Sequence, residues 1–299
     1  MDELSGQTVR GWVALVTGAG RGIGAATAAA LAAAGASVAV LARSTDEIAR
    51  VAARLRDAGH AGHASSGVTC DVGDPAAVRA AVAQVERGLG PVDVLINNAG
   101  VVAPLGPTAE IDVQAWAAAL AINLTGAFAC IQAVLPGTRA RRWGRSVNVS
   151  TGAATGRGLR HANAYSVSKA GLEMLTANLA AALAGTGVTV NAVRPGVVES
   201  AMQASPRAQS PARVGDAFVA PFRRLKDEGQ LLDARVPAQV IAARVAHDST
   251  GDIISVDGAR GTGATRTPAT GRRGMRAWTT GPWAGSIDGW GRCARRRSW

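Results

Sequence analysis

The sequence predicts an α/β protein built on a doubly wound parallel sheet. Short apolar runs that do not alternate with polar residues recur along the chain, and strands of this kind are covered on both faces. Alanine-rich stretches of helical length separate these runs. A glycine-rich turn joins the first apolar run to the first helical stretch. In such a fold, the Rossmann fold, ligands bind at the carboxyl ends of the strands.

The predicted strands and helices follow one another in a regular order. The first strand covers residues 13–17, and the helix over 23–34 ends before Gly35, the residue type that most often terminates a helix. The other expected strands cover residues 37–41, 92–96, 145–149 and 188–193. The other expected helices cover residues 45–58, 114–134 and 164–183.

Composition and charge divide the chain into a body and a tail. The 299 residues are 47% hydrophobic, which is enough for one large domain. The net charge is +11, but residues 259–299 hold nine basic residues and one acidic residue, and so carry +8 of it. Residues 1–258 are nearly balanced, which argues against a body that binds nucleic acid, because such a body needs clustered positive charge. We expect one domain over 1–258 and a tail over 259–299.

The tail is rich in Arg, Gly, Thr and Trp and contains neither Leu nor Val. No hydrophobic period predicts a helix or strand there, so we expect it to be disordered. Arg with interleaved Trp is compatible with binding to single-stranded nucleic acid or an acidic partner. The same composition fits a segment without function, such as read-through or frame-shifted coding sequence. Both alternatives stay open.

Cysteine usage and hydropathy indicate a cytoplasmic protein. Cys70, Cys130 and Cys293 have no CxxC spacing, so neither a disulfide framework nor a metal site is expected. Residues 1–10 are polar and lack the apolar region of a signal peptide. No stretch of about 18 residues is apolar without interruption, so no membrane span is predicted.

The turn over residues 17–24 reads Thr-Gly-Ala-Gly-Arg-Gly-Ile-Gly. Gly18 permits a sharp turn, Gly22 lets the backbone approach a pyrophosphate, and Gly24 lets the helix pack on the strand. The helix that begins near Ile23 offers free N–H groups and a positive dipole to phosphates. This strand–turn–helix context predicts a dinucleotide site.

The end of the second strand favours NADP over NAD. A carboxylate there would bind the ribose diol of NAD, but residues 41–44 read Leu-Ala-Arg-Ser. Arg43, with Ser44 beside it and Arg21 in the glycine-rich turn, can bind a 2′-phosphate through a guanidinium fork. The alternative is that both arginines are solvated surface residues.

Further motifs follow in order: Cys70-Asp71-Val72, Asn97-Asn98-Ala99-Gly100, Asn123, Tyr165-Ser166-Val167-Ser168-Lys169 and Arg194-Pro195-Gly196. With them, the chain resembles the short-chain dehydrogenase/reductase superfamily over about residues 9–258. The resemblance implies that Asp93 supports the sheet. It also implies a cofactor site made of Gly18, Arg21, Gly22, Ile23, Gly24, Arg43, Ser44, Asp71, Val72, Asn98, Ala99, Gly100, Tyr165, Lys169, Pro195, Gly196, Val198 and Ser200, the last four of which would hold the nicotinamide.

Tyr165 and Lys169 are the predicted centre of the chemistry. Tyr165 is the only tyrosine, and Lys169 is one of two lysines. Residues four apart on a helix share one face, about 6 Å apart. A nearby ammonium favours the phenolate and lowers the pKa of the tyrosine from about 10, which makes the phenol a usable proton donor to a carbonyl oxygen. The alternative is a surface Tyr–Lys pair.

The family's catalytic set has two more members, a serine and an asparagine. Thr151 aligns with the serine, but it lies 14 residues before Tyr165 where the family usually has 13, so Ser150 stays an alternative. Thr151 keeps the hydroxyl that would bind the substrate carbonyl. The resemblance gives Asn123 the role of binding a water that links Lys169 to solvent.

The predicted activity is NADPH-dependent reduction of a ketone or aldehyde, with Tyr165 as proton donor. The family chooses its substrate with the segment over residues 201–232, and residues 222–233 resemble the sepiapterin reductase and benzil reductase branch. That resemblance implies an aromatic ketone or diketone. The alternative is that residues 222–233 form only an amphipathic lid. The family also forms homodimers or homotetramers through its long helices. The alternative is a non-catalytic NADP sensor whose tail binds an acidic partner or nucleic acid.

Overall fold

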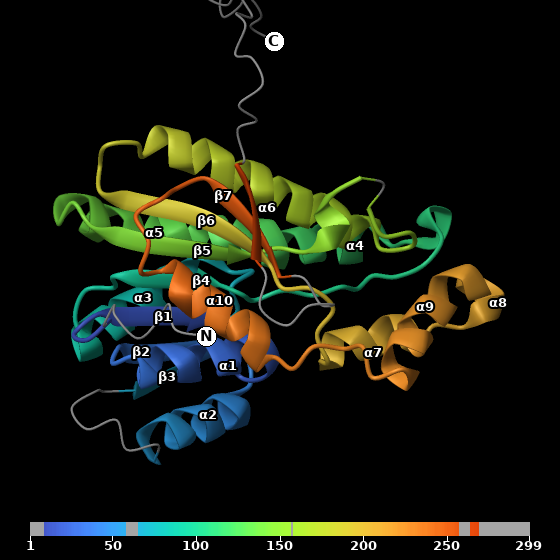
Figure 1. Cartoon of the computed structure of the whole chain (residues 1–299), viewed down its shortest axis with the longest axis horizontal. Helices are drawn as coiled ribbons and strands as arrows, with labels where there is room; N and C mark the ends of the chain where they lie inside the picture. Colours follow the sequence, from blue (N-terminus) through green and yellow to red (C-terminus); the bar gives the residue numbers. More distant parts are fainter. Residues whose placement is uncertain (1–8, 58–64, 157, 257–263, 269–299) are drawn as a thin grey trace, which may run out of the picture. The chain divides into compact units, whose positions relative to one another are not determined.

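A computed structural model describes residues 9–57, 65–156, 158–256 and 264–268, the last five by their backbone alone. The described strands form one sheet (Figure 1). They are β1 Val13–Thr17, β2 Ser37–Ala42, β3 Ser65–Thr69, β4 Val94–Asn97, β5 Gly144–Val149, β6 Val188–Arg194, β7 Asp252–Val256 and β8 Ala264–Pro268. Their order is β3-β2-β1-β4-β5-β6-β7-β8, and all pairs except β7–β8 are parallel. The order reverses between β1 and β4, the point where such sheets bind their ligands.

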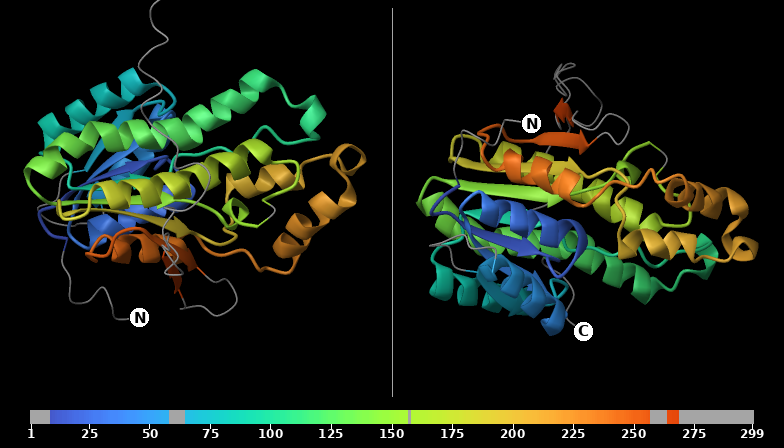
Figure 2. Two further views of the ribbon diagram at one scale, coloured as in Figure 1. Left: turned by 90° about the horizontal axis from the view of Figure 1, so that it is seen from above. Right: turned by 60° about the horizontal axis from the view of Figure 1, so that its bottom comes forward.

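Helices cover both faces of the sheet (Figures 1 and 2). Apolar residues of α1, α2 and α10 pack on one face, and those of α3 and α5 pack on the other, where α6 lies against β6. Three further helices, α7, α8 and α9, extend from one end of the sheet (Figure 1). The helices are α1 Gly22–Ala33, α2 Thr45–Asp57, α3 Pro75–Leu89, α4 Val113–Leu120, α5 Gly126–Ala140, α6 Asn163–Ala182, α7 Ala201–Arg207, α8 Pro211–Val214, α9 Asp216–Asp227 and α10 Arg235–Arg244.

The predicted doubly wound α/β fold is confirmed, and the elements that the sequence did not predict have physical reasons. Strand β3 contains Ser65, Ser66 and Gly67 rather than an apolar run, because it is an edge strand whose side chains are mostly not buried. Helix α3 follows it, and begins where Asp74 accepts hydrogen bonds from two backbone N–H groups and Pro75 occupies the first turn.

The predicted helix over 114–134 is three segments. A π-helical turn, Ala121–Thr125, separates α4 from α5. Its wider winding carries Asn123, whose side chain is fully buried. The Asn123 amide bonds both ways to Val101: Oδ1 accepts from the backbone N–H at 2.7 Å, and Nδ2 donates to the carbonyl oxygen at 2.8 Å. The interruption therefore binds this helix to the segment after β4.

The expectation that no segment could span a membrane needs one qualification. Within the ranges that the structure describes, one helical stretch, Val113–Ala140, passes by length and composition alone. It packs against α3 and α6 in a layer over the sheet. Of its most apolar 18 residues, 44% are buried within the structure.

The expectation that the chain after residue 258 forms no element is wrong for five residues. Strand β8 pairs antiparallel with β7, with Ala264 opposite Val256 and Pro268 opposite Asp252. An edge strand pairs through its backbone, so it needs no hydrophobic period of its own. Residues 257–263 and 269–299, which include the rest of the predicted tail, lie outside the described residues.

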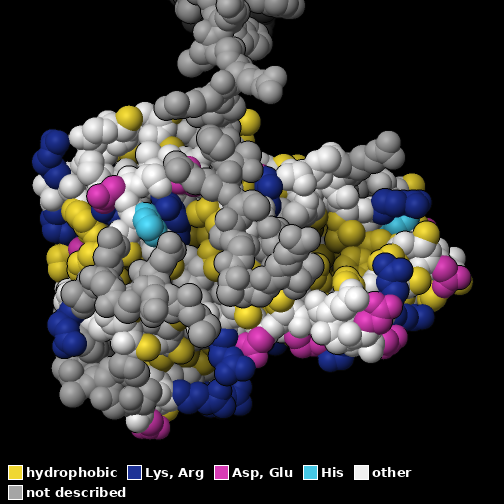
Figure 3. Space-filling view, in the orientation of Figure 1, with side chains coloured by type: hydrophobic (Ala, Val, Ile, Leu, Met, Phe, Trp, Pro, Cys, Tyr) yellow, Lys and Arg dark blue, Asp and Glu magenta, His cyan; other side chains and the backbone are white. Residues whose placement is uncertain are grey.

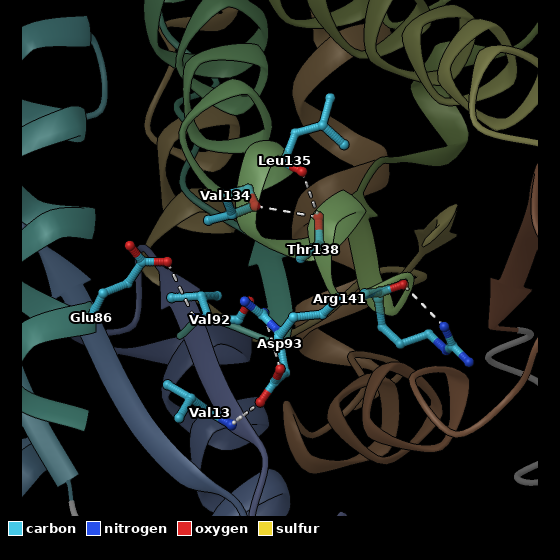
Figure 4. A network of polar contacts seen from close by, with 10 residues as sticks. Val13, Glu86, Val92, Asp93, Val134, Leu135, Thr138 and Arg141 are labelled. Carbon is cyan, nitrogen blue, oxygen red and sulfur yellow. Dashed lines mark hydrogen bonds and ion pairs between the residues drawn. The ribbon is translucent and has the colours of Figure 1, made fainter. Parts of the chain in front are cut away.

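Polar contacts hold the amino end of β4 against β1 (Figure 4). The Asp93 carboxylate accepts from the backbone N–H of Val13 at 3.0 Å and from Arg141 Nη2 at 3.2 Å. Arg141 also donates to the carbonyl oxygen of Val92 at 2.8 Å. Asp93 thus supports the sheet from the end opposite the ligand site.

Candidate functional site

A cavity of about 650 Å³ opens at the carboxyl ends of the parallel strands. Its walls come from the loops that follow β1, β2, β3, β4 and β6. Most of the predicted cofactor residues line it, namely Gly18, Arg21, Gly22, Ile23, Arg43, Ser44, Asp71, Val72, Asn98, Ala99, Gly100 and Ser200. Glu47, Val102, Glu199 and Met202 also line it, although the sequence motifs did not single them out.

Six predicted cofactor residues do not line this cavity: Gly24, Tyr165, Lys169, Pro195, Gly196 and Val198. Gly24 lies behind it, and a Cβ there would come within 2.5 Å of the Gly18 carbonyl oxygen. Its glycine is therefore needed for helix–strand packing. Val198 forms a parallel bridge with Leu232, which holds the chain after β6 against the segment that leads to α10.

The glycine-rich turn presents backbone to the cavity. Gly18 has φ +62°, and a Cβ there would lie 2.7 Å from the Cα of Ala99. Gly22 has φ +56° and begins α1, whose N-cap residue Arg21 makes no side-chain capping bond. The first N–H groups of the helix are therefore available to an anion. The turn fits the diphosphate of a dinucleotide.

The two arginines expected at the 2′-phosphate both reach the same wall. Their side chains are 70% and 65% exposed, for Arg21 and Arg43 respectively. Arg21 lies 3.4 Å from Glu47, and Arg43 lies 4.0 Å from Asp71. These exposed contacts are weak. The guanidinium groups can therefore turn to a phosphate, and Lys and Arg side chains do gather beside α1 and α2 (Figure 3).

Asn98 holds the turn in place from the next strand end. Its Nδ2 donates to the carbonyl oxygens of Thr17 and Gly18 at 3.0 and 3.1 Å. The Thr17 hydroxyl accepts from the backbone N–H groups of Asn98 and Ala99. These bonds join the loops after β1 and β4, on either side of the point where the strand order reverses.

Lys169 is buried beneath the site. Its Nζ donates to the carbonyl oxygen of Val149 at 2.7 Å, and its side chain is 3% exposed. Burial lowers the pKa of Lys169 from 10.5 to about 8. Gly100 leaves space for this group: a Cβ there would lie 3.5 Å from Nζ and 3.2 Å from Asn123 Oδ1. Lys169 and Asn123 therefore flank the same backbone segment.

The expected effect of Lys169 on the Tyr165 pKa is not what the structure shows. Burial raises the pKa of Tyr165, and a hydrogen bond with Thr151 acts in the opposite direction without reversing it. The ammonium of Lys169 is directed to Val149 instead. The prediction of a lowered pKa is therefore wrong, because desolvation of the phenol outweighs any nearby charge.

Thr151 and Ser150 differ in what their hydroxyls contact. The Thr151 hydroxyl bonds to Tyr165 and accepts from the backbone N–H of Ala153 at 3.3 Å. The Ser150 hydroxyl is buried and donates to Glu173 at 2.7 Å. Only the Thr151 hydroxyl lies beside the phenol in these contacts.

Apolar residues surround Tyr165 on its outer side. The tyrosine ring packs on a cluster from the loop after β4 and from α8 and α9, which includes Val102, Leu105, Val214 and Phe218. His161 and Phe222 each stack edge-on with Phe218, with ring centroids 5.4 Å apart. Figure 3 shows hydrophobic side chains lining a hollow between the α4–α6 side and α7–α9. The predicted substrate segment thus forms an aromatic and aliphatic wall.

Known proteins share this sequence and fold. The chain is 37% identical over 252 residues to cis-4-hydroxycyclohexanecarboxylate dehydrogenase of Sinomonas cyclohexanicum. The aligned region covers 82% of this chain and 95% of the relative. It is 43% identical over 188 residues to D-threitol dehydrogenase of Mycolicibacterium smegmatis, which covers 63% and 70% respectively. These relatives do not single out the sepiapterin reductase branch, which stays a prediction.

A solved structure also resembles this chain in sequence and fold. The crystal structure of an actinorhodin polyketide ketoreductase variant with NADPH superposes with a TM-score of 0.72 at 37% identity, over 83% of this chain and 96% of that one. The family model described as short chain dehydrogenase matches residues 12–211. With the strand order, the turn after β1 and the Tyr165–Lys169 helix already in place, this match shows that the chain belongs to the short-chain dehydrogenase family.

Proposed function

We propose that the protein is an NADP(H)-dependent oxidoreductase that reduces a ketone or aldehyde to an alcohol. The observation that carries the proposal is the arrangement of Tyr165, Thr151 and Lys169. The phenol bonds to the Thr151 hydroxyl, and the buried lysine lies one helical turn away, behind a cavity that fits a dinucleotide. Consumption of NADPH with a panel of aromatic ketones, diketones and aliphatic ketones tests it, and no turnover with any of them would contradict it.

Each of these side chains has a proposed role. Bound NADPH would supply the hydride. Tyr165 donates its proton to the carbonyl oxygen, and its raised pKa keeps the phenol protonated near neutral pH. Thr151 binds the same oxygen and orients it. Lys169 binds the ribose of the cofactor, and Asn123 holds the segment through which water returns the proton.

The proposed cofactor is NADP rather than NAD. The ketoreductase described above is an NADPH complex, and the end of β2 in this chain carries Arg43 and no carboxylate. Replacing Arg43 with Ala is expected to raise the Kd for NADPH about fivefold to tenfold, because an exposed charge-assisted contact is lost, and to leave the Kd for NADH unchanged. Fluorescence titration measures both. The matched control is Arg50→Ala. Arg50 is exposed like Arg43, but it lies on α2 and outside the cavity, and equal losses in the two variants would contradict the assignment.

Thr151 is proposed as the catalytic hydroxyl in preference to Ser150. Thr151→Ala is expected to lower kcat about a hundredfold, as loss of one donor to a developing oxyanion does. Thr151→Ser keeps the hydroxyl and should retain most activity. The loss in kcat caused by Ser150→Ala should be at least about tenfold smaller than the loss caused by Thr151→Ala, because the Ser150 hydroxyl donates to Glu173 and not to the substrate. The opposite order in steady-state kinetics would assign the role to Ser150.

An aromatic ketone or diketone is the proposed substrate class. Tyr165 packs in one cluster with Phe218 and Phe222, and His161 stacks on the buried Phe218, so the surroundings of the phenol are aromatic in character. The resemblance of residues 222–233 to the sepiapterin and benzil reductase branch points the same way. The ketone panel decides this finer question: a lower kcat/KM for benzil than for an aliphatic ketone of equal size would argue against it.

A homodimer or homotetramer through the long helices is proposed as well. Phe128 on α5 and Val167 and Met174 on α6 are apolar and exposed by 43%, 50% and 68%. Such exposed apolar side chains favour an interface. Met174→Glu is expected to reduce the mass measured by light scattering, and an unchanged mass would place the interface elsewhere.

The free cysteines Cys70 and Cys130 are compatible with the proposed cytoplasmic location.

A further inference from the structure

A buried carboxylate connects two strand ends beside the proposed site. Glu173 lies on α6, one turn after Lys169 and two turns after Tyr165. Its side chain is 10% exposed. It accepts a hydrogen bond from Ser150 Oγ and two from the guanidinium of Arg194, through Nε and Nη2, each at 2.7 Å. These three contacts join α6 to the carboxyl ends of β5 and β6.

The contact with Ser150 holds the end of β5. Ser150 stands between Val149, whose carbonyl oxygen accepts from Lys169, and Thr151, whose hydroxyl bonds to Tyr165. Its backbone N–H donates to the carbonyl oxygen of Val193 at 2.8 Å. A shift of Ser150 would therefore move the acceptor of the lysine and the catalytic hydroxyl together.

The contact with Arg194 holds the end of β6. Arg194 is the last residue of that strand and directly precedes Pro195 and Gly196, the start of the loop proposed to hold the nicotinamide. Gly196 has φ +75°, so the chain turns sharply directly after this strand. A two-pronged carboxylate–guanidinium contact fixes the plane and direction of the arginine as well as its distance.

We propose that Glu173 is a positioning residue that holds the nicotinamide loop in register with Thr151 and Lys169. This inference rests on the proposed function. A buried ion pair contributes little net stability compared with apolar residues of the same volume, so stability alone does not explain why three polar groups converge here. A carboxylate that fixes the ends of two neighbouring strands does explain it.

Two variants separate positioning from stability. Glu173→Gln keeps the volume and an acceptor for Ser150, but leaves the Arg194 charge uncompensated, so Tm should fall. Glu173→Gln combined with Arg194→Met removes both charges and should regain most of that Tm. Glu173→Gln loses the bond from Arg194 Nη2 to Oε2 and with it the two-pronged geometry, and the double variant loses both bonds. Placement of the nicotinamide loop should therefore be lost in both, whatever their Tm.

Two ligands report on that placement without any turnover. NADPH contacts the whole cofactor site, whereas 2′,5′-ADP lacks the nicotinamide half. In both variants of the full chain, we expect the Kd for NADPH to rise about tenfold, with a change below about twofold for 2′,5′-ADP. The matched control is Asp252→Asn with Arg244→Met, another buried pair, at the amino end of β7, where both Kd values should stay unchanged.

The inference would be overturned if the double variant bound NADPH as tightly as the wild type, or if the Kd values for NADPH and 2′,5′-ADP rose equally. The Glu173–Arg194 pair would then be a structural contact. With an active enzyme, both variants should also lose about tenfold in kcat. If the wild type binds NADPH but reduces no carbonyl, the proposed function fails, and the comparison of the two ligands still decides the role of Glu173.

Discussion

Replacing Tyr165 with Phe is expected to lower kcat for carbonyl reduction by about 10²–10⁴, the range typical of a lost general acid. The substitution removes one oxygen atom and keeps the ring that packs on the apolar cluster of α8 and α9. Burial already keeps the phenol protonated, so the variant removes a proton donor rather than a charge. Stopped-flow or steady-state measurement of NADPH oxidation with an active ketone gives the ratio.

The control for this variant is cofactor binding. Because the substitution removes only one hydroxyl, the Kd for NADPH should change by less than about threefold, no more than one weak hydrogen bond accounts for. Turnover within about tenfold of wild type would show that Tyr165 is not the proton donor. A large loss of NADPH affinity would instead show that the substitution disturbs the cofactor site.

Replacing Lys169 with Met is expected to make the protein more stable and almost inactive. Below pH 8 the folded chain carries a buried ammonium, and its pKa is lowered from 10.5 to about 8 by burial. That shift corresponds to a cost of about 3 kcal/mol. Methionine removes this cost. The lost bond to the Val149 carbonyl oxygen destabilises the folded state by about 1 kcal/mol. At pH 7 the unfolding free energy should therefore rise by about 2 kcal/mol. Activity should fall about a hundredfold or more, because the proposed contact between the ammonium and the cofactor ribose is lost.

The pH dependence of stability provides a second measurement of the same group. The folded pKa of Lys169 lies below its unfolded value, so the unfolded chain binds more protons between about pH 8 and 10.5. The unfolding free energy of the wild type should therefore rise with pH across this window, and that rise should be absent in Lys169→Met. Denaturant titrations at pH 7, 9 and 10.5 compare the two proteins. Parallel curves would show that the lysine does not titrate as a buried group.

Much of the proposed site was predictable because its motifs consist of residues that are close together in the sequence. Short segments of sequence suffice to recognise three features: the glycines of the turn over 17–24, the single tyrosine, and the lysine four residues after it. The parallel sheet was predictable because strands covered on both faces lack polar alternation. Strands β3 and β8 were not, since edge strands need only backbone pairing and leave no apolar run.

The fold class, the dinucleotide turn and the Tyr165–Lys169 helix were predictable from the amino-acid sequence, because each depends on residues within a few positions of one another. The balance of charge and burial around them became visible in the folded structure. That structure showed that burial raises the Tyr165 pKa, that Ser150 is bound to Glu173 while Thr151 lies beside the phenol, and that Arg194 is held from α6. These outcomes depend on desolvation and on contacts between segments far apart in the chain, and no local pattern encodes either.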